Sequence, residues 1–257
     1  MKVVPIALNT FRESVRDRVL YNLVLFVLLL VGASIFLGEL SFSQETKIIV
    51  DTGLSAMLIF GVLISIFIGI GLVYKEIDKR TVYNLLAKPI HRYEFILGKY
   101  FGLCFTLLVN TAVMAVAVAA ALLYIKGGWD AIQLKIWPAA YLIFLELMVV
   151  TAVALLFSSF SSPMLSALFT FSLFIIGSFS KDLKLFADTV GSGIVRVLCQ
   201  VLYYLLPNLA NFHHITETAN GQAASSSMLI AATTYAALYI AALLSATVLI
   251  FQRRNFK

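Results

Sequence analysis

The chain has 257 residues, of which 61% are hydrophobic and only 12% are charged, and its mean hydropathy is +0.97. A soluble domain carries about a quarter charged residues, so this composition excludes an ordinary soluble globular protein. The formal net charge of +6 does not indicate a nucleic-acid partner, because the basic residues lie in short segments between long apolar runs, as membrane topology requires.

Residues 1–18 predict an amphipathic helix that lies on the inner face of the membrane. One face, spaced as in a helix, carries Val4, Leu8, Phe11, Val15 and Val19. The other face carries Arg12, Glu13, Arg16 and Asp17. An N-terminus that only set the orientation of the first span would need the charges but not the apolar stripe. We therefore expect an interfacial helix whose basic side chains approach anionic lipid head groups.

Six apolar segments are long enough to cross a bilayer, for which about 20 residues are needed. These predicted spans are 19–38, 53–74, 100–125, 139–160, 164–180 and 228–251. A seventh run, 195–206, is too short and is followed by Pro207-Asn208, which predicts a re-entrant segment within an outer region 181–227. The expected fold is an all-α integral membrane protein with a single transmembrane domain over 1–257.

The distribution of Lys and Arg predicts the orientation of these spans. With six spans and both termini in the cytoplasm, 13 of the 19 basic residues lie on the cytoplasmic side and 6 outside. This excess agrees with the positive-inside rule. An odd number of spans would place Arg253-Arg254 outside.

The segment 75–99, between the second and third spans, carries six basic and three acidic residues. Apolar side chains interrupt the charges, and residues 78–87 predict a short helix with one apolar face, which Pro89 stops. A second helix is expected to begin near His91-Arg92 and to enter the third span. The alternative is a solvated, positively charged loop. A short helix with an apolar face is better suited to docking another protein.

This segment resembles the coupling-helix region of type-2 ABC exporter permeases, a family often associated with multicopper-enzyme maturation. The residues that carry the resemblance are Glu76, Asp78, Thr81, Leu85, Leu86, Lys88, Pro89, Ile90, Arg92, Phe95, Gly98 and Lys99, together with the run 205–209, LLPNL, ahead of the last span. Arg80 stands where many members carry glycine before the threonine.

The resemblance implies a permease subunit, not an enzyme, in a bacterial inner membrane. Its spans would be moved by a separate cytoplasmic ABC ATPase dimer, and it would pair with a second copy or a paralogue. The expected ATPase interface consists of Glu76, Asp78, Arg80, Thr81, Leu85, Leu86, Lys88 and Arg92. The N-terminal helix, with Phe11, Arg12 and Arg16, would also touch the ATPase. Export rather than import follows from the resemblance alone.

The chain lacks the motif of a nucleotide-binding P-loop. Gly98-Lys99 is followed by Tyr100 and has no glycine-rich lead. We therefore expect no cofactor on this chain, with ATP and Mg²⁺ bound by the partner ATPase.

Polar side chains within the spans are few, and they define a candidate translocation path of Glu146, Asn110 and Thr151. A carboxyl group at membrane depth is costly and is a functional candidate by default. The alternatives are a protonated or hydrogen-bonded Glu146 that ties helices together, and a threonine that bonds its own helix backbone.

Other groups give weaker signals. His213, His214 and Glu217 are expected outside the bilayer, and their spacing matches no established metal motif, so no metal is predicted. Cys104 and Cys199 lie in separate segments and are expected to be core residues. Two other functions remain possible: an ion-coupled secondary transporter, which would need more ionisable groups at the midplane, and a membrane enzyme, which would need clustered His, Asp or Ser. Short outer loops and nearly uncharged spans favour a lipid-like or amphipathic cargo.

Overall fold

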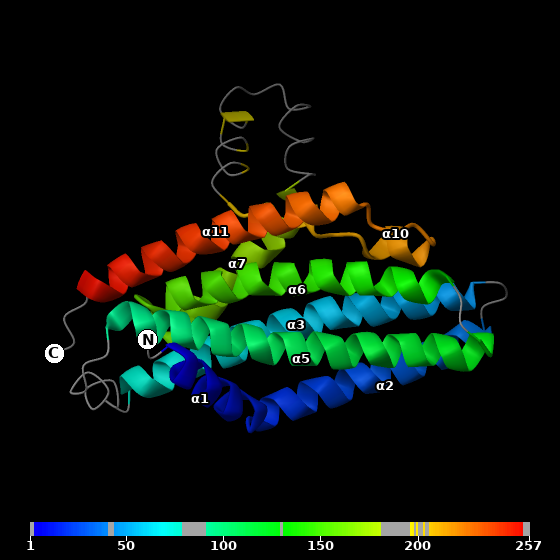
Figure 1. Cartoon of the computed structure of the whole chain (residues 1–257), viewed down its shortest axis with the longest axis horizontal. Helices are drawn as coiled ribbons and strands as arrows, with labels where there is room; N and C mark the ends of the chain where they lie inside the picture. Colours follow the sequence, from blue (N-terminus) through cyan, green and yellow to red (C-terminus); the bar gives the residue numbers. More distant parts are fainter. Residues whose placement is uncertain are drawn as a thin grey trace.

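The protein is a bundle of long α-helices (Figure 1). The computed structural model describes residues 3–40, 44–78, 91–128, 131–180, 196–197, 199, 203 and 206–253. The helices are α1 Val3–Val15, α2 Arg18–Leu40, α3 Glu45–Asp78, α5 Arg92–Lys126, α6 Ala131–Ser158, α7 Pro163–Ser178, the 3-10 turn η1 Leu209–Asn211, α10 Ile215–Ala219 and α11 Ser226–Arg253. Within the described residues there is no β-strand, which confirms the all-α prediction.

Among the described residues, four stretches are long and apolar enough to cross a membrane: Glu45–Gly71 of α3, Arg92–Lys126 of α5, Ala131–Ser158 of α6 and Ser226–Gln252 of α11. Two shorter apolar helices accompany them, Val27–Phe36 within α2 and the whole of α7. The 16 residues of α7 reach about 24 Å, short of a typical hydrocarbon core of about 30 Å. The chain is therefore a multi-pass membrane protein, and the count of six spans stays a prediction.

Two predicted loops are shorter than expected. The structure extends α3 to begin at Glu45, where its backbone comes close to Gly38 of α2, so most of the expected outer loop 39–52 is helical. Likewise α6 begins at Ala131 and contains Pro138, which the sequence had suggested as the end of a loop. A proline inside a membrane helix is tolerated because neighbouring helices can satisfy the freed carbonyl.

The centre of the bundle is formed by α3 and α6, which pack along much of their lengths. Met57, Ile64, Leu142 and Leu147 are almost completely buried between their neighbours. The Oγ atom of Ser65 lies 2.7 Å from Oγ1 of Thr151. A hydrogen bond between span-forming helices adds a directional tie to packing that is otherwise apolar.

The beginning of α1, the end of α3, the beginning of α5 and the end of α11 gather at one end of the bundle (Figure 1). The end of α2, the beginning of α3, the end of α5 and the beginning of α6 lie at the opposite end with α10. The described helices thus agree with both chain ends lying on one side. Which side is cytoplasmic stays a prediction.

Candidate functional site

The N-terminal helix α1 packs closely on the first turns of α5. Gly98 and Gly102 of α5 face α1, and a Cβ atom added to Gly102 would lie 2.6 Å from the carbonyl oxygen of Ala7. At Gly98 an added Cβ would lie 2.6 Å from Cβ of Ile6. Small residues four positions apart let two helix backbones approach in this way. The pair Gly98 and Gly102 therefore sets the position of α1.

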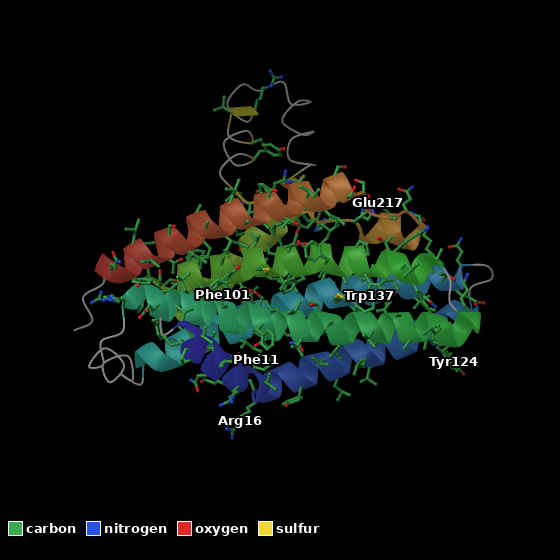
Figure 2. All side chains as sticks on the ribbon, in the orientation of Figure 1. Phe11, Arg16, Phe101, Tyr124, Trp137 and Glu217 are labelled. Atoms are coloured by element: carbon green, nitrogen blue, oxygen red, sulfur yellow. The ribbon has the colours of Figure 1, made fainter. Side chains whose placement is uncertain are left out.

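The apolar stripe of α1 faces outward. Thr10 and Ser14 are fully buried, whereas Val4 is 64% and Leu8 49% exposed. Phe11 packs edge-on against Phe105 of α5, with ring centroids 4.5 Å apart. The polar side chains Arg12 and Arg16 are exposed, and Arg16 points away from the bundle (Figure 2).

These contacts fit a helix that turns its small polar face to the protein and its apolar stripe to lipid. The helix that the sequence predicts over 1–18 is confirmed for Val3–Val15. It stops before Arg16-Asp17, and Val19, predicted as part of the same stripe, belongs to α2. The chain turns at Arg16-Asp17, and α2 runs in a different direction from α1 (Figure 1).

Lys99 adds an ionic contact between α1 and α5. The sequence placed Lys99 in the cytoplasmic loop, but its side chain is 1% exposed on α5. Its Nζ atom lies 3.8 Å from Oε2 of Glu13 and 6.0 Å from the centroid of the Phe95 ring. A buried charge is tolerated only where opposite charge or a π face compensates for lost hydration. Lys99 therefore ties the N-terminal helix to the helix that follows the segment 79–90.

Arg92 joins the beginning of α5 to the end of α11. Its Nη1 atom donates to the carbonyl oxygens of Phe251 and Gln252, each at 2.9 Å. The rings of Phe95 and Phe251 stack beside this contact, with centroids 5.9 Å apart. The last carbonyls of a helix have no intrahelical partner, so a guanidinium group there satisfies them and matches the helix dipole. Arg92 thus has an intramolecular role that the sequence did not reveal.

Most of the predicted ATPase interface lies outside the described residues. Arg80, Thr81, Leu85, Leu86 and Lys88 all fall within 79–90, as does most of the expected helix 78–87. Glu76 and Asp78 belong to the last turns of α3. The helix expected near His91-Arg92 is confirmed, since α5 begins at Arg92.

A second site is built by residues 207–222, which we call the return segment. The backbone N–H of Asn208 donates to the Tyr235 hydroxyl of α11 at 2.7 Å, and the hydroxyl of Ser180 donates to Oδ1 of Asn208 at 2.5 Å. At the other end of the segment, Nζ of Lys135 donates to the carbonyl oxygen of Gly221 at 2.7 Å. Gly221 adopts φ 79°, a left-handed conformation that favours glycine. These contacts fix the segment to the bundle at both ends.

The return segment brings His213 into contact with Glu146, which the sequence analysis did not anticipate. The sequence placed His213 outside the bilayer, yet its Nε2 atom lies 3.3 Å from Oε1 of Glu146, and that carboxyl group is fully buried on α6. The pair is ionic only when the imidazole is protonated. Hydropathy does not reveal such a contact between a loop and a helix of the bundle, and the placement of His213 relative to the bilayer stays a prediction.

A polar chamber of about 350 Å³ opens beside this pair. It is lined by Ser55, Leu58, Ser178, Ala210, His213, Ile215, Thr216 and Glu217. The side chain of Glu217 is 49% exposed, and its Oε2 atom lies 3.9 Å from Nδ1 of His214 (Figure 2). Among the described residues, no three His, Cys, Asp or Glu side chains are grouped closely enough to hold a metal.

The other two predicted path residues do not line the chamber. Thr151 is fully buried, and its hydroxyl donates to the Leu147 carbonyl of its own helix at 2.8 Å. Asn110 is 7% exposed on α5, and its Nδ2 atom has no hydrogen-bond partner among the described residues. Of the three, Glu146 is in contact with a residue that lines the chamber, His213, which the sequence analysis did not include in the path.

The sequence was compared with known proteins. Residues 4–256 match the family described as "ABC-2 family transporter protein". A comparison with curated proteins gives no match. Since the family profile covers nearly the whole chain, the chain belongs to the ABC-2 family of transporter proteins, the membrane permeases of ABC transporters.

Proposed function

We propose that this chain is the permease subunit of an ATP-driven exporter, and that a separate ABC ATPase moves it through the segment 75–99. The permease pairs with a second copy or a paralogue, in a bacterial inner membrane with both termini in the cytoplasm. Nucleotide and Mg²⁺ stay on the ATPase.

The observation that supports this proposal is the arrangement on both sides of residues 79–90. The segment joins α3 and α5, two continuous helices of 34 and 35 residues that each include a candidate membrane span. At the same end, α1 is seated on Gly98 and Gly102, while Arg92 holds the end of α11. A push on the segment is therefore passed to four helices together.

This mechanical coupling requires no catalytic residue on the permease. ATP binding closes the motor dimer, and the closed dimer binds one arrangement of the spans better than another. The transport step is then a population shift driven by that difference in binding free energy. The charges at Glu76, Asp78, Arg80 and Lys88 orient docking, and Leu85 and Leu86 enter a groove.

Co-purification tests the proposal directly. Expressed with a candidate ABC ATPase, the chain is expected to retain the ATPase on an affinity column. Leu86→Asp is expected to release it, whereas the conservative Leu86→Met retains it. Arg92→Glu is a poor test because it also breaks the contact with α11. Equal recovery with Leu86→Asp and Leu86→Met contradicts docking at this segment.

The Glu146–His213 pair supports a second candidate, an ion-coupled transporter, because ionisable groups at membrane depth often carry protons. This candidate expects transport driven by a proton gradient without ATP, and loss of that transport in Glu146→Gln. Transport that needs ATP and persists in Glu146→Gln excludes it.

A further inference from the structure

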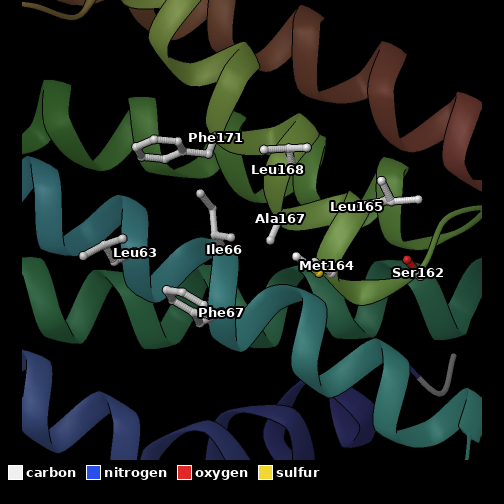
Figure 3. Close-up of a pocket in the computed structure, with 9 residues that line it drawn as sticks. All are labelled: Leu63, Ile66, Phe67, Ser162, Met164, Leu165, Ala167, Leu168 and Phe171. Atoms are coloured by element: carbon white, nitrogen blue, oxygen red, sulfur yellow. The ribbon is translucent and has the colours of Figure 1, made fainter.

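Two of the helices that line the polar chamber, α3 and α7, also line a second cavity. This cavity is an apolar groove of about 490 Å³ between α3 and α7 (Figure 3). Its lining residues are Leu63, Ile66, Phe67, Ser162, Met164, Leu165, Ala167, Leu168 and Phe171. In Figure 3, Ile66 of α3 and Ala167 of α7 point toward one another across the groove.

The chamber and the groove lie at successive levels of α3 and α7. On α3, Ser55 and Leu58 line the chamber, and Leu63 begins the groove about 7.5 Å further along the helix axis. On α7, which runs the opposite way, Ser178 lines the chamber and Phe171 lines the groove. The two cavities, which share no lining residue, therefore follow one another between α3 and α7, and we call the polar chamber and the apolar groove together the crevice.

The polar end favours a cation that donates hydrogen bonds. The ionisable side chains among the described residues that line it are His213 and Glu217, with the buried carboxyl group of Glu146 behind His213. The described lining includes no Lys or Arg. Ser55 and Ser178 add hydroxyl oxygens that accept from N–H donors.

The apolar end is suited to an alkyl chain and is open to the side. Met164 is 85% and Phe67 57% exposed, and Ser162 is the one polar side chain in the described lining. A chain that occupies the groove would cover these side chains with matching apolar surface.

We propose that the crevice between α3 and α7 binds a single-chain amphiphile with a primary ammonium head, the head in the polar chamber and the alkyl chain in the apolar groove. Glu217 and the chamber hydroxyls accept hydrogen bonds from the ammonium group, and Glu146 acts through His213 as a positioning residue. The assignment of this amphiphile as cargo rests on the proposed function, whereas its binding does not.

Fluorescence quenching in nanodiscs tests the site on the full chain without the ATPase. A reporter is placed in the groove by Phe171→Trp in a background of Trp129→Phe and Trp137→Phe. Dibromododecylamine, at neutral pH, is the probe. We expect the amine to quench the fluorescence of the introduced tryptophan in a saturable way. The matched dibromododecanoic acid should need at least a tenfold higher concentration for the same quenching.

Two variants separate the head from the chain. Glu217→Gln is expected to weaken amine binding about three- to tenfold, as for a half-exposed charge, while Glu45→Gln at the start of α3 leaves it unchanged. Ala167→Phe fills the groove and is expected to abolish saturable quenching, with the exposed Ala231→Phe of α11 as its control. Glu217→Gln keeps the test decisive if Ala167→Phe does not fold.

Equal quenching by the amine and the acid would mean ordinary lipid in the groove and would overturn the proposal. If quenching is lost when the permease dimerises, and added amine does not compete with dimerisation, a second copy of the permease covers the groove. That result would also overturn the proposal. If amine binding fails while the ATPase still docks, this inference alone is wrong. If amine binding holds while docking fails, the exporter assignment is wrong.

Discussion

The close approach of α1 to α5 gives a quantitative prediction for Gly102→Ala. The added methyl group would lie 2.6 Å from both the Ala7 carbonyl oxygen and Cβ of Thr10, whereas carbon atoms in contact normally lie about 3.5–4.0 Å apart. Neither neighbour is the end of a flexible side chain, so α1 must move away by about 1 Å. Overpacking of this kind costs about 1–3 kcal/mol.

The matched control is Gly71→Ala in α3, where no described atom lies within 4 Å of the added methyl group. Both changes gain about 1 kcal/mol of helix propensity, so their difference isolates the clash. We expect the melting temperature of Gly102→Ala to lie roughly 2–12 °C below that of Gly71→Ala.

Thiol reactivity provides the assay for this pair of variants. Cys104 and Cys199 are both buried, so a maleimide dye reacts with them as the purified protein unfolds on heating. Equal melting temperatures for the two variants would refute close packing of α1 on Gly102. They would also remove the argument that α1 moves with α5.

Three further predictions concern polar contacts. Arg92→Met is expected to lower the local stability of the last turn of α11 by about 1–2 kcal/mol. Hydrogen exchange measured there by mass spectrometry should rise roughly tenfold, with Arg92→Lys intermediate. Unchanged exchange argues against the cap. His213→Leu leaves the Glu146 carboxyl group buried without its neighbour and is expected to lower the free energy of unfolding by about 1–3 kcal/mol. The double variant with Glu146→Leu is expected to restore most of this loss. Additive losses in the double-mutant cycle would contradict the pairing. Thr151→Val removes the contact with Ser65 and is expected to cost about 0.6 kcal/mol in thermal melts, no more than Ser65→Ala; a much larger loss would point to a role beyond packing.

The sequence predicts the helices well because lipid imposes a strong length and hydropathy rule on each of them. The predicted third span, for example, lies wholly within α5, and the sixth within α11. The errors lie where helices continue beyond the apolar region. The last turns of α3 contain charged residues, yet they remain helical because the helix hydrogen bonds are already in place.

The candidate site was less predictable, because its parts come from distant segments. Glu146 was identified from its charge alone, but its neighbour His213 is 67 positions later in the chain, and only tertiary structure brings them together. The break at Pro207-Asn208 indicated a turn without indicating its destination. Arg92 was assigned to a partner because charge does not distinguish an intermolecular contact from a helix cap.

The proposed mechanism requires the segment between α3 and α5 to lie in the cytoplasm and to be held by an ATPase. A cysteine placed there by Asn84→Cys, with Cys104 and Cys199 changed to alanine, can be labelled with a membrane-impermeant maleimide. We expect rapid labelling in inverted vesicles, slow labelling in right-side-out vesicles, and protection in inverted vesicles when the ATPase is co-expressed. Labelling from the outer side, or no protection by the ATPase, would contradict this mechanism.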